Sequence, residues 1–229
     1  MDALSSENNI IRCDMLQKRF NVGTQAIYAL KDVSIEIDRG EYVAIVGHSG
    51  SGKSTLMNII GLIDSPTSGE YFFEGKRIDE YKEKELAAIR NQKIGYIFQS
   101  FFLEPKYDVY KNVEMPLLIA GVPRKERKER ILAAIERVGM SHRLRNRGSS
   151  LSGGEKQRVA IARALVCDPC LILADEPCGN LDTVNSAEIM KILSTLHKEG
   201  RTVILITHNN EDSMQAQRRI TMKDGQIVL

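Results

Sequence analysis

A glycine-rich segment with one lysine is the clearest sign of chemistry in this sequence. Residues 47–54 read Gly-His-Ser-Gly-Ser-Gly-Lys-Ser and fit the pattern G-x-x-x-x-G-K-[ST] in full. Glycines let successive backbone N–H groups curl into a nest for an anion, and a following helix adds its own unpaired N–H groups. Lys53 supplies a mobile charge for the β- and γ-phosphates, and the Ser54 hydroxyl suits Mg²⁺. The segment therefore predicts a cradle for a nucleotide with Mg²⁺.

Two acidic residues follow a later apolar run. Asp175 and Glu176 come directly after Leu171–Ala174, which is expected to be a buried strand. The carboxyl edge of a parallel sheet is where ligands bind in open α/β folds. We expect Asp175 to hold Mg²⁺ through water and Glu176 to polarise the attacking water, as phosphoryl transfer requires. Such a pair is weak evidence alone and gains weight because the chain already has the cradle.

A second helix start is also rich in glycine. Ser152 and Glu155 form the pattern S-x-x-E, a capping box that opens a helix. The capping box does not explain Gly153 and Gly154, since each glycine costs about 1 kcal/mol relative to alanine in a helix. What they offer is bare backbone that a ligand can approach closely. A nucleotide in the first cradle could thus be shared with this second site on another copy.

The elements around these residues indicate an α/β protein. Tyr42–Val46 is a continuous apolar run typical of a central strand, and it leads into the cradle and a helix over residues 54–62. Val33, Ile35 and Ile37 alternate with polar residues, the pattern of a half-buried strand. Two hairpins are expected, at 69–78 with the turn Glu74-Gly75 and at 219–229 with the turn Asp224-Gly225.

Later segments alternate between helix and strand. Helices are predicted at 153–166 and 185–198, and strands at 171–174 and 203–207, which implies a parallel sheet. Residues 80–94 and 124–140 have helical patterns, the second with an apolar stripe of Ile131, Ile135 and Val138. The prediction is one α/β core, an antiparallel β piece near the start, and a mainly helical insertion over approximately 80–150.

Composition argues against a self-contained membrane protein, a secreted mini-protein and a fibrous protein. The 229 residues are 42% hydrophobic and 27% charged, which is ordinary globular composition. A net charge of +2 gives little support to nucleic-acid binding. No apolar run approaches the roughly 18 residues of a spanning helix, and no signal peptide is evident. Four cysteines do not make a disulfide framework, so a reducing cytoplasm is expected.

Residues 151–157, Leu-Ser-Gly-Gly-Glu-Lys-Gln, resemble the signature motif of ABC-type ATPases. The resemblance covers about residues 10–228, after a tail of residues 1–9, with every family motif in the expected order. It implies a single ATPase domain of the P-loop NTPase fold and a head-to-tail dimer that buries two ATP molecules. By this match Ser152, Gly153 and Gly154 contact the γ-phosphate held in the cradle of the other subunit.

Further roles follow from the same resemblance. Gln99 resembles the glutamine that touches Mg²⁺ and the transport partner, and Asp182 the D-loop residue that bridges the subunits. His208 resembles the switch histidine on the γ-phosphate. Phe20 stands where the family places an aromatic ring under adenine, although a core role for it stays open. The implied ATP cradle comprises Gly47, His48, Ser49, Gly50, Ser51, Gly52, Lys53, Ser54 and Thr55, and the implied catalytic residues are Lys53, Gln99, Glu176 and His208.

The segments 58–61, 95–99 and 176–182 look closest to one branch of the family, which serves macrolide and peptide export, lipoprotein release and cell division. Cys178 stands where that branch usually has threonine, and His48 where proline or a small residue is common. Both changes leave the phosphate chemistry intact. Tyr107-Asp108 replaces the usual Leu-Thr where the family meets its permease, so the identity of the partner stays open.

The resemblance implies an ATPase subunit that powers a separate transmembrane permease from the inner face of the membrane, without nucleic acid as a partner. A regulatory, division-type ATPase that signals through a membrane partner would have the same nucleotide site and stays an alternative. A soluble ABC ATPase of DNA repair or translation usually carries coiled-coil insertions or a second ATPase domain, and neither fits in 229 residues.

Three other features have plain interpretations. Cys167 and Cys170 lack a second pair for a metal site and flank an Asp-Pro turn, so a structural role is expected. The basic run 124–130 is expected to be a solvated helix face, with contact to a partner or lipid as the alternative. Residues 101–103, Phe-Phe-Leu, could be core or a socket for a permease helix.

Overall fold

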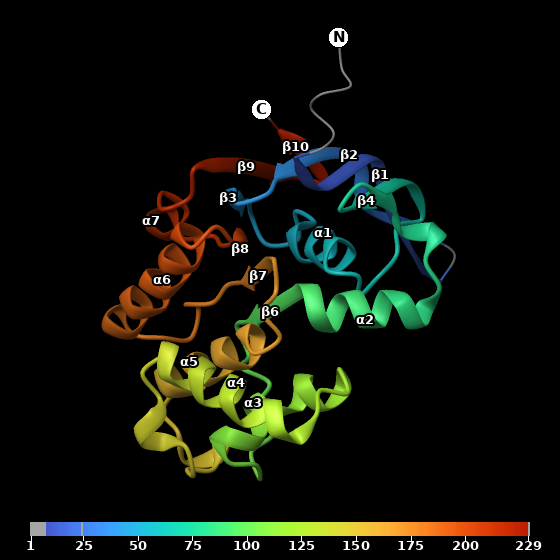
Figure 1. The fold of residues 1–229 in the computed structure, drawn as a ribbon. Coiled ribbons are helices and arrows are strands. Elements are labelled where there is room, and N and C mark those ends of the chain that lie inside the picture. The colour runs from blue at the N-terminus through green and yellow to red at the C-terminus, as the bar shows by residue number, and fades with distance from the viewer. Residues whose placement is uncertain (1–7, 24, 229) are drawn as a thin grey trace. The chain divides into compact units, whose positions relative to one another are not determined.

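A computed structural model of the protein describes residues 8–23 and 25–228 (Figure 1). The chain divides into two compact units. The first takes in the chain up to Ala87 and again from Gly200, and the second is Ala88–Glu199. Within the described residues, no helix combines the length and apolar character needed to cross a bilayer.

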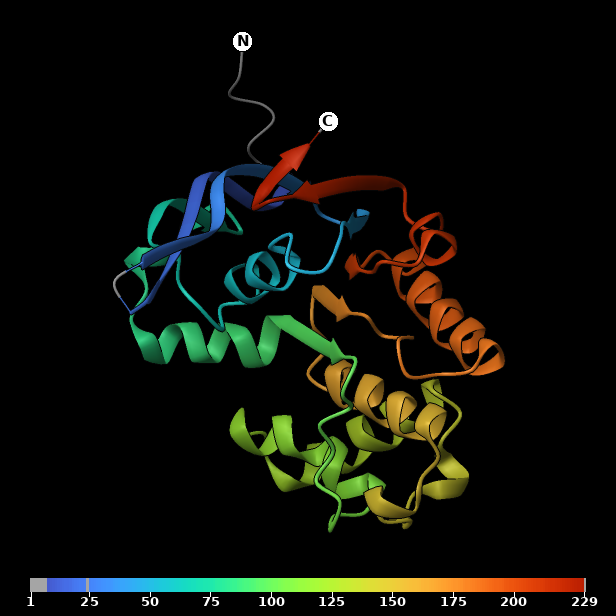
Figure 2. The same cartoon turned by 180° about the vertical axis from the view of Figure 1, so that it is seen from behind.

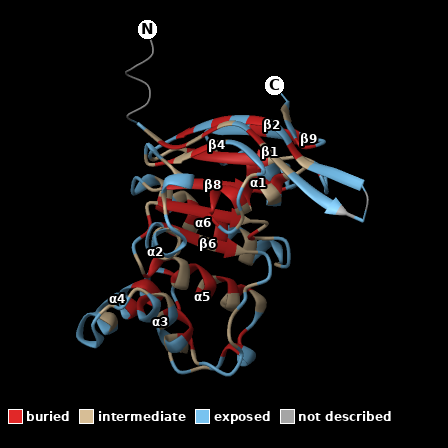
Figure 3. Ribbon diagram, turned by 90° about the vertical axis from the view of Figure 1, so that its right-hand side faces the viewer, coloured by how far each residue is buried: buried red, intermediate tan, exposed pale blue. Residues whose placement is uncertain are grey.

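The first unit contains an antiparallel sheet of four strands in the order β2-β1-β4-β5. Its strands are β1 (Asn9–Val22), β2 (Gln25–Asp38), β4 (Ser68–Phe73) and β5 (Lys76–Arg77). The predicted alternation in β2 is confirmed, since Val33, Ile35 and Ile37 are buried and their neighbours exposed. The Glu74-Gly75 turn between β4 and β5 is confirmed as well. The distal part of the β1–β2 hairpin is largely exposed (Figure 3).

The other strands of the first unit are mostly parallel, and a helix packs beside them. Strand β3 (Tyr42–Val46) lies between β8 (Thr202–Ile206) and β9 (Arg218–Lys223) and is parallel to both, as expected for a central strand. Strand β10 (Gln226–Val228) pairs antiparallel with β9 across the predicted Asp224-Gly225 turn. Helix α1 (Lys53–Ile60) follows β3 and lies beneath the antiparallel sheet in Figure 1. The Tyr71 hydroxyl donates to the Ile60 carbonyl at 2.5 Å and ties β4 to this helix.

The second unit combines two parallel strands with helices. Strand β6 (Ile94–Phe98) pairs with β7 (Leu171–Asp175) from Ile94 opposite Leu171 to Phe98 opposite Asp175. Strand β6 thus falls inside the range predicted as a helical insertion. The helices are α3 (Val109–Ile119), α4 (Arg124–Arg137), α5 (Gly153–Leu165) and α6 (Thr183–Lys198). Helices α3, α4 and α5 pack against one another (Figure 2), and α2 (Glu83–Lys93) crosses the boundary between the units.

Helix α4 confirms the predicted stripe, because Ile131, Ile135 and Val138 are all buried. Helix α6 begins at Thr183, two residues before the predicted start, because Asp182 caps it by accepting a hydrogen bond from the Asn185 N–H. The second unit therefore buries the apolar faces that the sequence pattern marked.

Helix α3 falls inside the predicted helical insertion but was not predicted as a separate element. Pro116 lies inside it, and proline is disfavoured in a helix interior. Its buried stripe of Val109, Val113 and Leu117 nevertheless repeats every four residues. Asp108 caps the helix by accepting from the Lys111 N–H at 2.8 Å. Asp108 is one of the departures from the family pattern, and aspartate caps a helix as well as threonine does.

Candidate nucleotide site

The glycine loop that joins β3 to α1 has a backbone fixed by its surroundings. Gly52 precedes α1 with φ 102° in the left-handed region, and a Cβ there would lie 2.6 Å from the Ala29 carbonyl oxygen. Gly47 has φ 156°, and a Cβ there would overlap the Met222 carbonyl. Side chains are therefore excluded at both ends of the loop by main-chain atoms. The residues between them include exposed His48, Ser49 and Gly50.

Lys53 begins α1 and bends back over the loop. Its Nζ donates to the Gly47 carbonyl at 2.8 Å and to the His48 carbonyl at 2.9 Å, and the residue is 8% exposed. No side chain caps the start of α1, and its first turn contains no acidic residue. The Ser51 hydroxyl is buried and has no hydrogen-bond partner among the described residues. N–H groups at a helix start without a side-chain cap, a lysine ammonium, and a hydroxyl without a partner in the described residues suit this loop to phosphate oxygens.

Phe20 lies on β1 and is 43% exposed, so the core role left open for it is wrong. The Lys18 ammonium lies 5.2 Å from the centre of its ring. Lys18 also donates to the Asp64 carboxylate at 2.6 Å and to the Ser65 carbonyl at 2.7 Å. Because Asp64 and Ser65 follow α1, the exposed ring is tied to the far end of the helix that carries Lys53. An exposed aromatic face of this kind can stack on a base.

His208 is exposed and follows β8. Strand β8 runs parallel to β3 with Ile206 opposite Ile45, and the Thr207 N–H donates to the Ile45 carbonyl at 3.3 Å. The carboxyl ends of both strands therefore meet at one edge of the sheet, so His208 and the glycine loop lie at that same edge.

Gln99 and Glu176 follow the paired ends of β6 and β7 in the second unit. Because Phe98 lies opposite Asp175, both site residues emerge at one edge of this strand pair. The Asn180 amide donates to the Gln99 carbonyl at 3.2 Å. Glu176 has φ 46°, a left-handed backbone that is uncommon for a non-glycine residue. The two predicted roles thus fall on loops that are bonded to each other.

Gln157 received no role from the sequence, yet it links these loops. It is fully buried in α5, and its Nε2 donates to the Phe98 carbonyl at 3.2 Å and to the Pro177 carbonyl at 2.7 Å. Those carbonyls lie next to Gln99 and Glu176 in the chain. The sequence offered one signal for this role, a glutamine on the buried face of a polar helix. It does not show which carbonyl groups that side chain contacts.

The predicted capping box at Ser152 is present. Its hydroxyl accepts from the Glu155 N–H at 3.3 Å, and the Glu155 carboxylate accepts from the Ser152 N–H at 2.8 Å. The Ser152 N–H, and then Arg143 at 2.8 Å, hold the pKa of Glu155 below its usual range. The carboxylate therefore stays ionised at the start of α5, where the helix dipole favours a negative charge.

Gly153 and Gly154 are glycines for different local reasons. A Cβ at Gly153 would meet only ordinary contacts, the nearest being Leu181 Cδ2 at 3.5 Å. A Cβ at Gly154 would overlap the amide oxygen of Asn185. Only Gly153 therefore leaves backbone approachable in the way that the sequence argument expected for both.

Asp182 is exposed and caps α6. Its two carboxylate oxygens accept from the Asn185 backbone N–H at 2.8 Å and from the Asn185 side-chain amide at 2.7 Å. These hydrogen bonds, the backbone one first, hold the pKa of Asp182 below its usual range. The Asp182 carboxylate thus caps α6 within its own chain. A bridge from Asp182 to another subunit would therefore be made by a side chain that is already ordered.

The predicted site residues group by unit. Phe20, the glycine loop with Lys53, Ser54 and Thr55, and His208 belong to the first unit, whereas Gln99, Asp175, Glu176, residues 152–154 and Asp182 belong to the second. No group of three His, Cys, Asp or Glu side chains among the described residues could hold a metal ion. Mg²⁺ commonly binds through one or two protein oxygens together with substrate phosphates. Ser54 in the first unit, and Gln99 and Asp175 in the second, each carry an oxygen of the kind that Mg²⁺ prefers.

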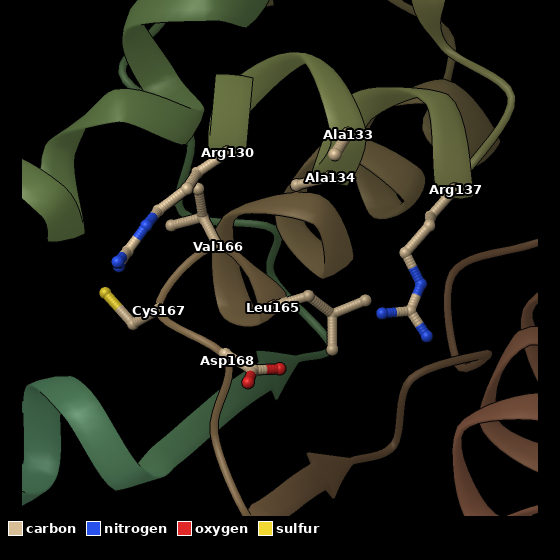
Figure 4. Close-up of a pocket in the computed structure, with 8 residues that line it drawn as sticks. All are labelled: Arg130, Ala133, Ala134, Arg137, Leu165, Val166, Cys167 and Asp168. Carbon is tan, nitrogen blue, oxygen red and sulfur yellow. The ribbon is translucent and has the colours of Figure 1, made fainter. Parts of the chain in front are cut away.

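A cavity of about 540 Å³ lies elsewhere in the second unit, between α4 and the end of α5 (Figure 4). Arg130 and Arg137 reach it from α4, and Cys167 and Asp168 reach it from the turn after α5. Arg130 pairs with Glu126 at 3.8 Å and Arg137 with Glu199, so the guanidinium charges are already compensated. Burial raises the pKa of the Cys167 thiol, which keeps it protonated and unreactive at neutral pH.

Comparisons with known proteins agree with this geometry. Residues 30–179 match the family described as ABC transporter. The chain is 48% identical over 219 residues to the Uncharacterized ABC transporter ATP-binding protein YknY of Bacillus subtilis, covering 96% of this chain and 95% of that protein. It is 49% identical over 211 residues to the Macrolide export ATP-binding/permease protein MacB of Chlorobaculum tepidum, covering 92% of this chain but 32% of MacB.

A solved structure extends the similarity to three dimensions. The dimeric, post-hydrolysis structure of the ATP-binding cassette MJ0796 bound to ADP and Pi has a TM-score of 0.88 and 38% identity. The match covers 96% of this chain and 97% of that one. It confirms the predicted fold class, an α/β P-loop NTPase with a parallel-sheet core, an antiparallel β subdomain and an inserted helical subdomain.

Proposed function

The chain belongs to the ABC transporter family as an ATP-binding protein, and from that membership we propose that it hydrolyses Mg-ATP in a head-to-tail dimer to drive a separate membrane permease. The observation that carries the proposal is the loop between β3 and α1. There Lys53 bends over the start of α1, which has no side-chain cap, and the buried Ser51 hydroxyl has no partner in the described part of the chain. Such a loop is suited to a triphosphate, because main-chain atoms already fix its conformation at Gly47 and Gly52.

Most of the groups that bind the nucleotide in this scheme belong to the first unit, and Gln99 and Asp175 come from the second. Lys53 and the N–H groups of residues 47–55 bind the phosphates, and the ring of Phe20 stacks on adenine. Ser54, Gln99 and Asp175 would hold Mg²⁺, which neutralises phosphate charge when bound. His208 contacts the γ-phosphate from the sheet edge that it shares with the glycine loop.

The second unit supplies the groups for hydrolysis. Glu176 accepts a hydrogen bond from the attacking water and so orients it toward the γ-phosphate. The Ser152 hydroxyl and the N–H groups of Gly153 and Gly154 serve the nucleotide bound by the partner subunit, because the Ser152 N–H is already donated to Glu155. Asp182 lies at the interface. Gln157 holds the main chain beside Gln99 and Glu176 in place.

Export is the form of transport that the relatives support best. MacB is named as a macrolide export ATP-binding and permease protein, and a relative in Pseudomonas entomophila is named for pyoverdine export. We infer that the permease moves peptides or macrolides outward or releases lipoproteins, with this chain on the inner face of the membrane. These relatives favour transport over a purely regulatory role.

Exposed apolar side chains mark a surface for the permease. Phe102 is 67% exposed after Gln99, and on α3 Leu118 is 50% and Ile119 72% exposed. The exposure of Phe102 supports the socket interpretation at that residue, whereas Phe101 and Leu103 are half-buried. A permease helix that covers such side chains would remove apolar area from water.

Phosphate release by the purified protein tests the nucleotide site. Lys53→Ala should abolish ATP hydrolysis, because the ammonium on the phosphates is lost, whereas Lys84→Ala on the exposed face of α2 should leave it unchanged. Near-normal turnover by Lys53→Ala would refute the cradle.

Size-exclusion chromatography tests the dimer. Glu176→Gln should bind ATP without hydrolysing it and accumulate as an ATP-loaded dimer. A variant that binds ATP but elutes only as a monomer would count against the head-to-tail arrangement.

A further inference from the structure

Asn185, in the first turn of α6, joins two loops that the proposed dimer uses together. We propose that Asn185 is a positioning residue that locks the signature loop, residues 152–154, to Asp182, so that both present one rigid surface to the nucleotide of the partner subunit. This inference rests on the proposed function. It assigns Asn185 no contact with nucleotide, because its side chain faces other groups of its own chain.

Three hydrogen bonds hold the Asn185 side chain and its turn. Its backbone N–H and its Nδ2 donate to the two oxygens of Asp182 at 2.8 and 2.7 Å. Its Oδ1 accepts from Arg158 Nη1 at 3.3 Å. The amide therefore has only one orientation that satisfies both neighbours, with the nitrogen toward Asp182 and the oxygen toward α5. The ionised state of Asp182, favoured by the same bonds, keeps the acceptor in place.

Gly154 shows how closely this amide approaches the signature loop. A Cβ at Gly154 would overlap Asn185 Oδ1 and would lie 3.1 Å from Asn185 Cβ. The φ of Gly154 is not positive, so its backbone does not require glycine. Gly153, one residue earlier, has ordinary space around it. We infer that residue 154 is glycine because Asn185 occupies the place of its side chain.

Arg158 extends the contact by one helical turn. Its Nη1 also reaches Glu188 Oε2 at 2.5 Å, so α5 and α6 share two successive side-chain links. Gly154 and Arg158 are four residues apart on α5, and Asn185 and Glu188 three apart on α6, so each set lies on one helix face. The starts of the two helices are thus joined where their loops would meet the partner.

A double-mutant cycle tests the lock. Gly154→Ala should reduce ATP turnover about tenfold or more, since its methyl group displaces the Asn185 amide and the loops couple through that contact. Asn185→Ala should lower kcat about three- to tenfold with little change in KM, because the cradle that binds ATP is untouched. The double variant should recover to near the level of Asn185→Ala, because the amide that overlaps the methyl group is gone. Only the Cβ of residue 185 remains, 3.1 Å away, and it must shift by a few tenths of an ångström. Thr183→Ala, on the same turn but outside the lock, should match wild type.

Several outcomes would overturn the inference. If the double variant stays as inactive as Gly154→Ala, then Gly154 is needed for a ligand and not for Asn185. Recovery of the unfolding free energy without recovery of turnover would reduce Asn185 to a purely structural contact. If Gly154→Ala fails to fold, Asn185→Asp decides, because it keeps the shape but turns an oxygen toward Asp182. Wild-type turnover in Asn185→Asp and Asn185→Ala would then reject the lock.

The wild-type protein separates this inference from the proposed function. A wild type that releases no phosphate overturns both. An active wild type with an unrescued double variant overturns only the role of Asn185.

Discussion

The two glycine-rich helix starts of this protein are similar in sequence but differ in what shapes them. At Gly52 the backbone is left-handed, and the atom that excludes a side chain is the Ala29 carbonyl oxygen. At Gly154 the backbone is ordinary, and the excluding atoms belong to the side chain of Asn185. The first loop is therefore shaped by main chain and the second by an exchangeable side chain.

This difference determines how each loop responds to change. A main-chain obstacle cannot be removed by substitution, so the phosphate cradle should tolerate no side chain at its ends. A side-chain obstacle can be removed, so the signature loop should accept a change that is compensated nearby. In the proposed function, the cradle binds ATP within one subunit, whereas the second loop is used only when two subunits meet.

The largest effect is expected at Gly52. Gly52→Ala should abolish binding of a fluorescent ATP analogue and lower the free energy of unfolding by more than about 1–2 kcal/mol, because a left-handed backbone and an overlap are imposed together. Gly75→Ala is the matched control, since its φ is 78° but nothing lies within 4 Å of its Cβ position. It should lose some stability and keep its affinity. Wild-type affinity in Gly52→Ala would show that main chain does not shape the cradle.

A smaller effect, on turnover but not on stability, is expected at Gly153. Gly153→Ala has room for its methyl group, so the free energy of unfolding in urea should stay constant or rise by up to about 1 kcal/mol. ATP turnover should still fall about tenfold or more, because a methyl group keeps the phosphate from the backbone by a fraction of an ångström or more. Unchanged turnover would mean that no phosphate approaches Gly153. A loss of stability would mean that this glycine, like Gly154, has a neighbour in its own chain.

Local patterns predicted most of the fold and the cradle. Residues 47–54 form a contiguous motif, and the alternation in β2 or the stripe in α4 can be read over a few residues. Turns such as Asp224-Gly225 carry their own conformational preference. Helix α3 was predicted only as part of a helical insertion. Its Pro116 is locally unfavourable, and the burial of Val113 and Leu117 offsets that penalty.

Contacts between distant residues were beyond the sequence. Gln157 meets the Phe98 carbonyl, 59 residues away, and Lys18 meets Asp64, 46 residues away. The two glycines 153 and 154 looked equivalent because the sequence does not show which neighbour faces each one. Only the folded chain reveals that Asn185 accounts for one of them.

Acid pH should affect the two loops differently. The free energy of unfolding that Glu155 contributes at the signature loop, about 0.3–1 kcal/mol for a carboxylate at a helix start, should be lost in acid. The pKa of Glu155 is lowered by the Ser152 N–H and Arg143, so its stabilisation is complete above about pH 4.3, the usual glutamate value. It is lost as the pH falls through the lowered pKa. Glu155→Gln should therefore unfold more easily than wild type at pH 7, and the difference should disappear in acid. Residues 47–54 contain no carboxylate, so the cost of Lys53→Met should not follow this profile. A Glu155→Gln difference that is constant across the titration would contradict the assignment.

The smallest effect is expected at Lys18, which is the test of whether side chains matter near the cradle. Its ammonium lies 5.2 Å from the centre of the Phe20 ring and pairs with Asp64. Lys18→Met should raise the KM for ATP about two- to fivefold, the worth of an exposed cation–π contact, and leave kcat unchanged. Lys18→Arg should retain most of the affinity. Lys76→Met, which removes a similar contact with Tyr81 at 4.0 Å, should leave KM as in wild type. If Lys18→Met were as severe as Gly52→Ala, side chains would shape the nucleotide site after all, and the contrast with the signature loop would fail.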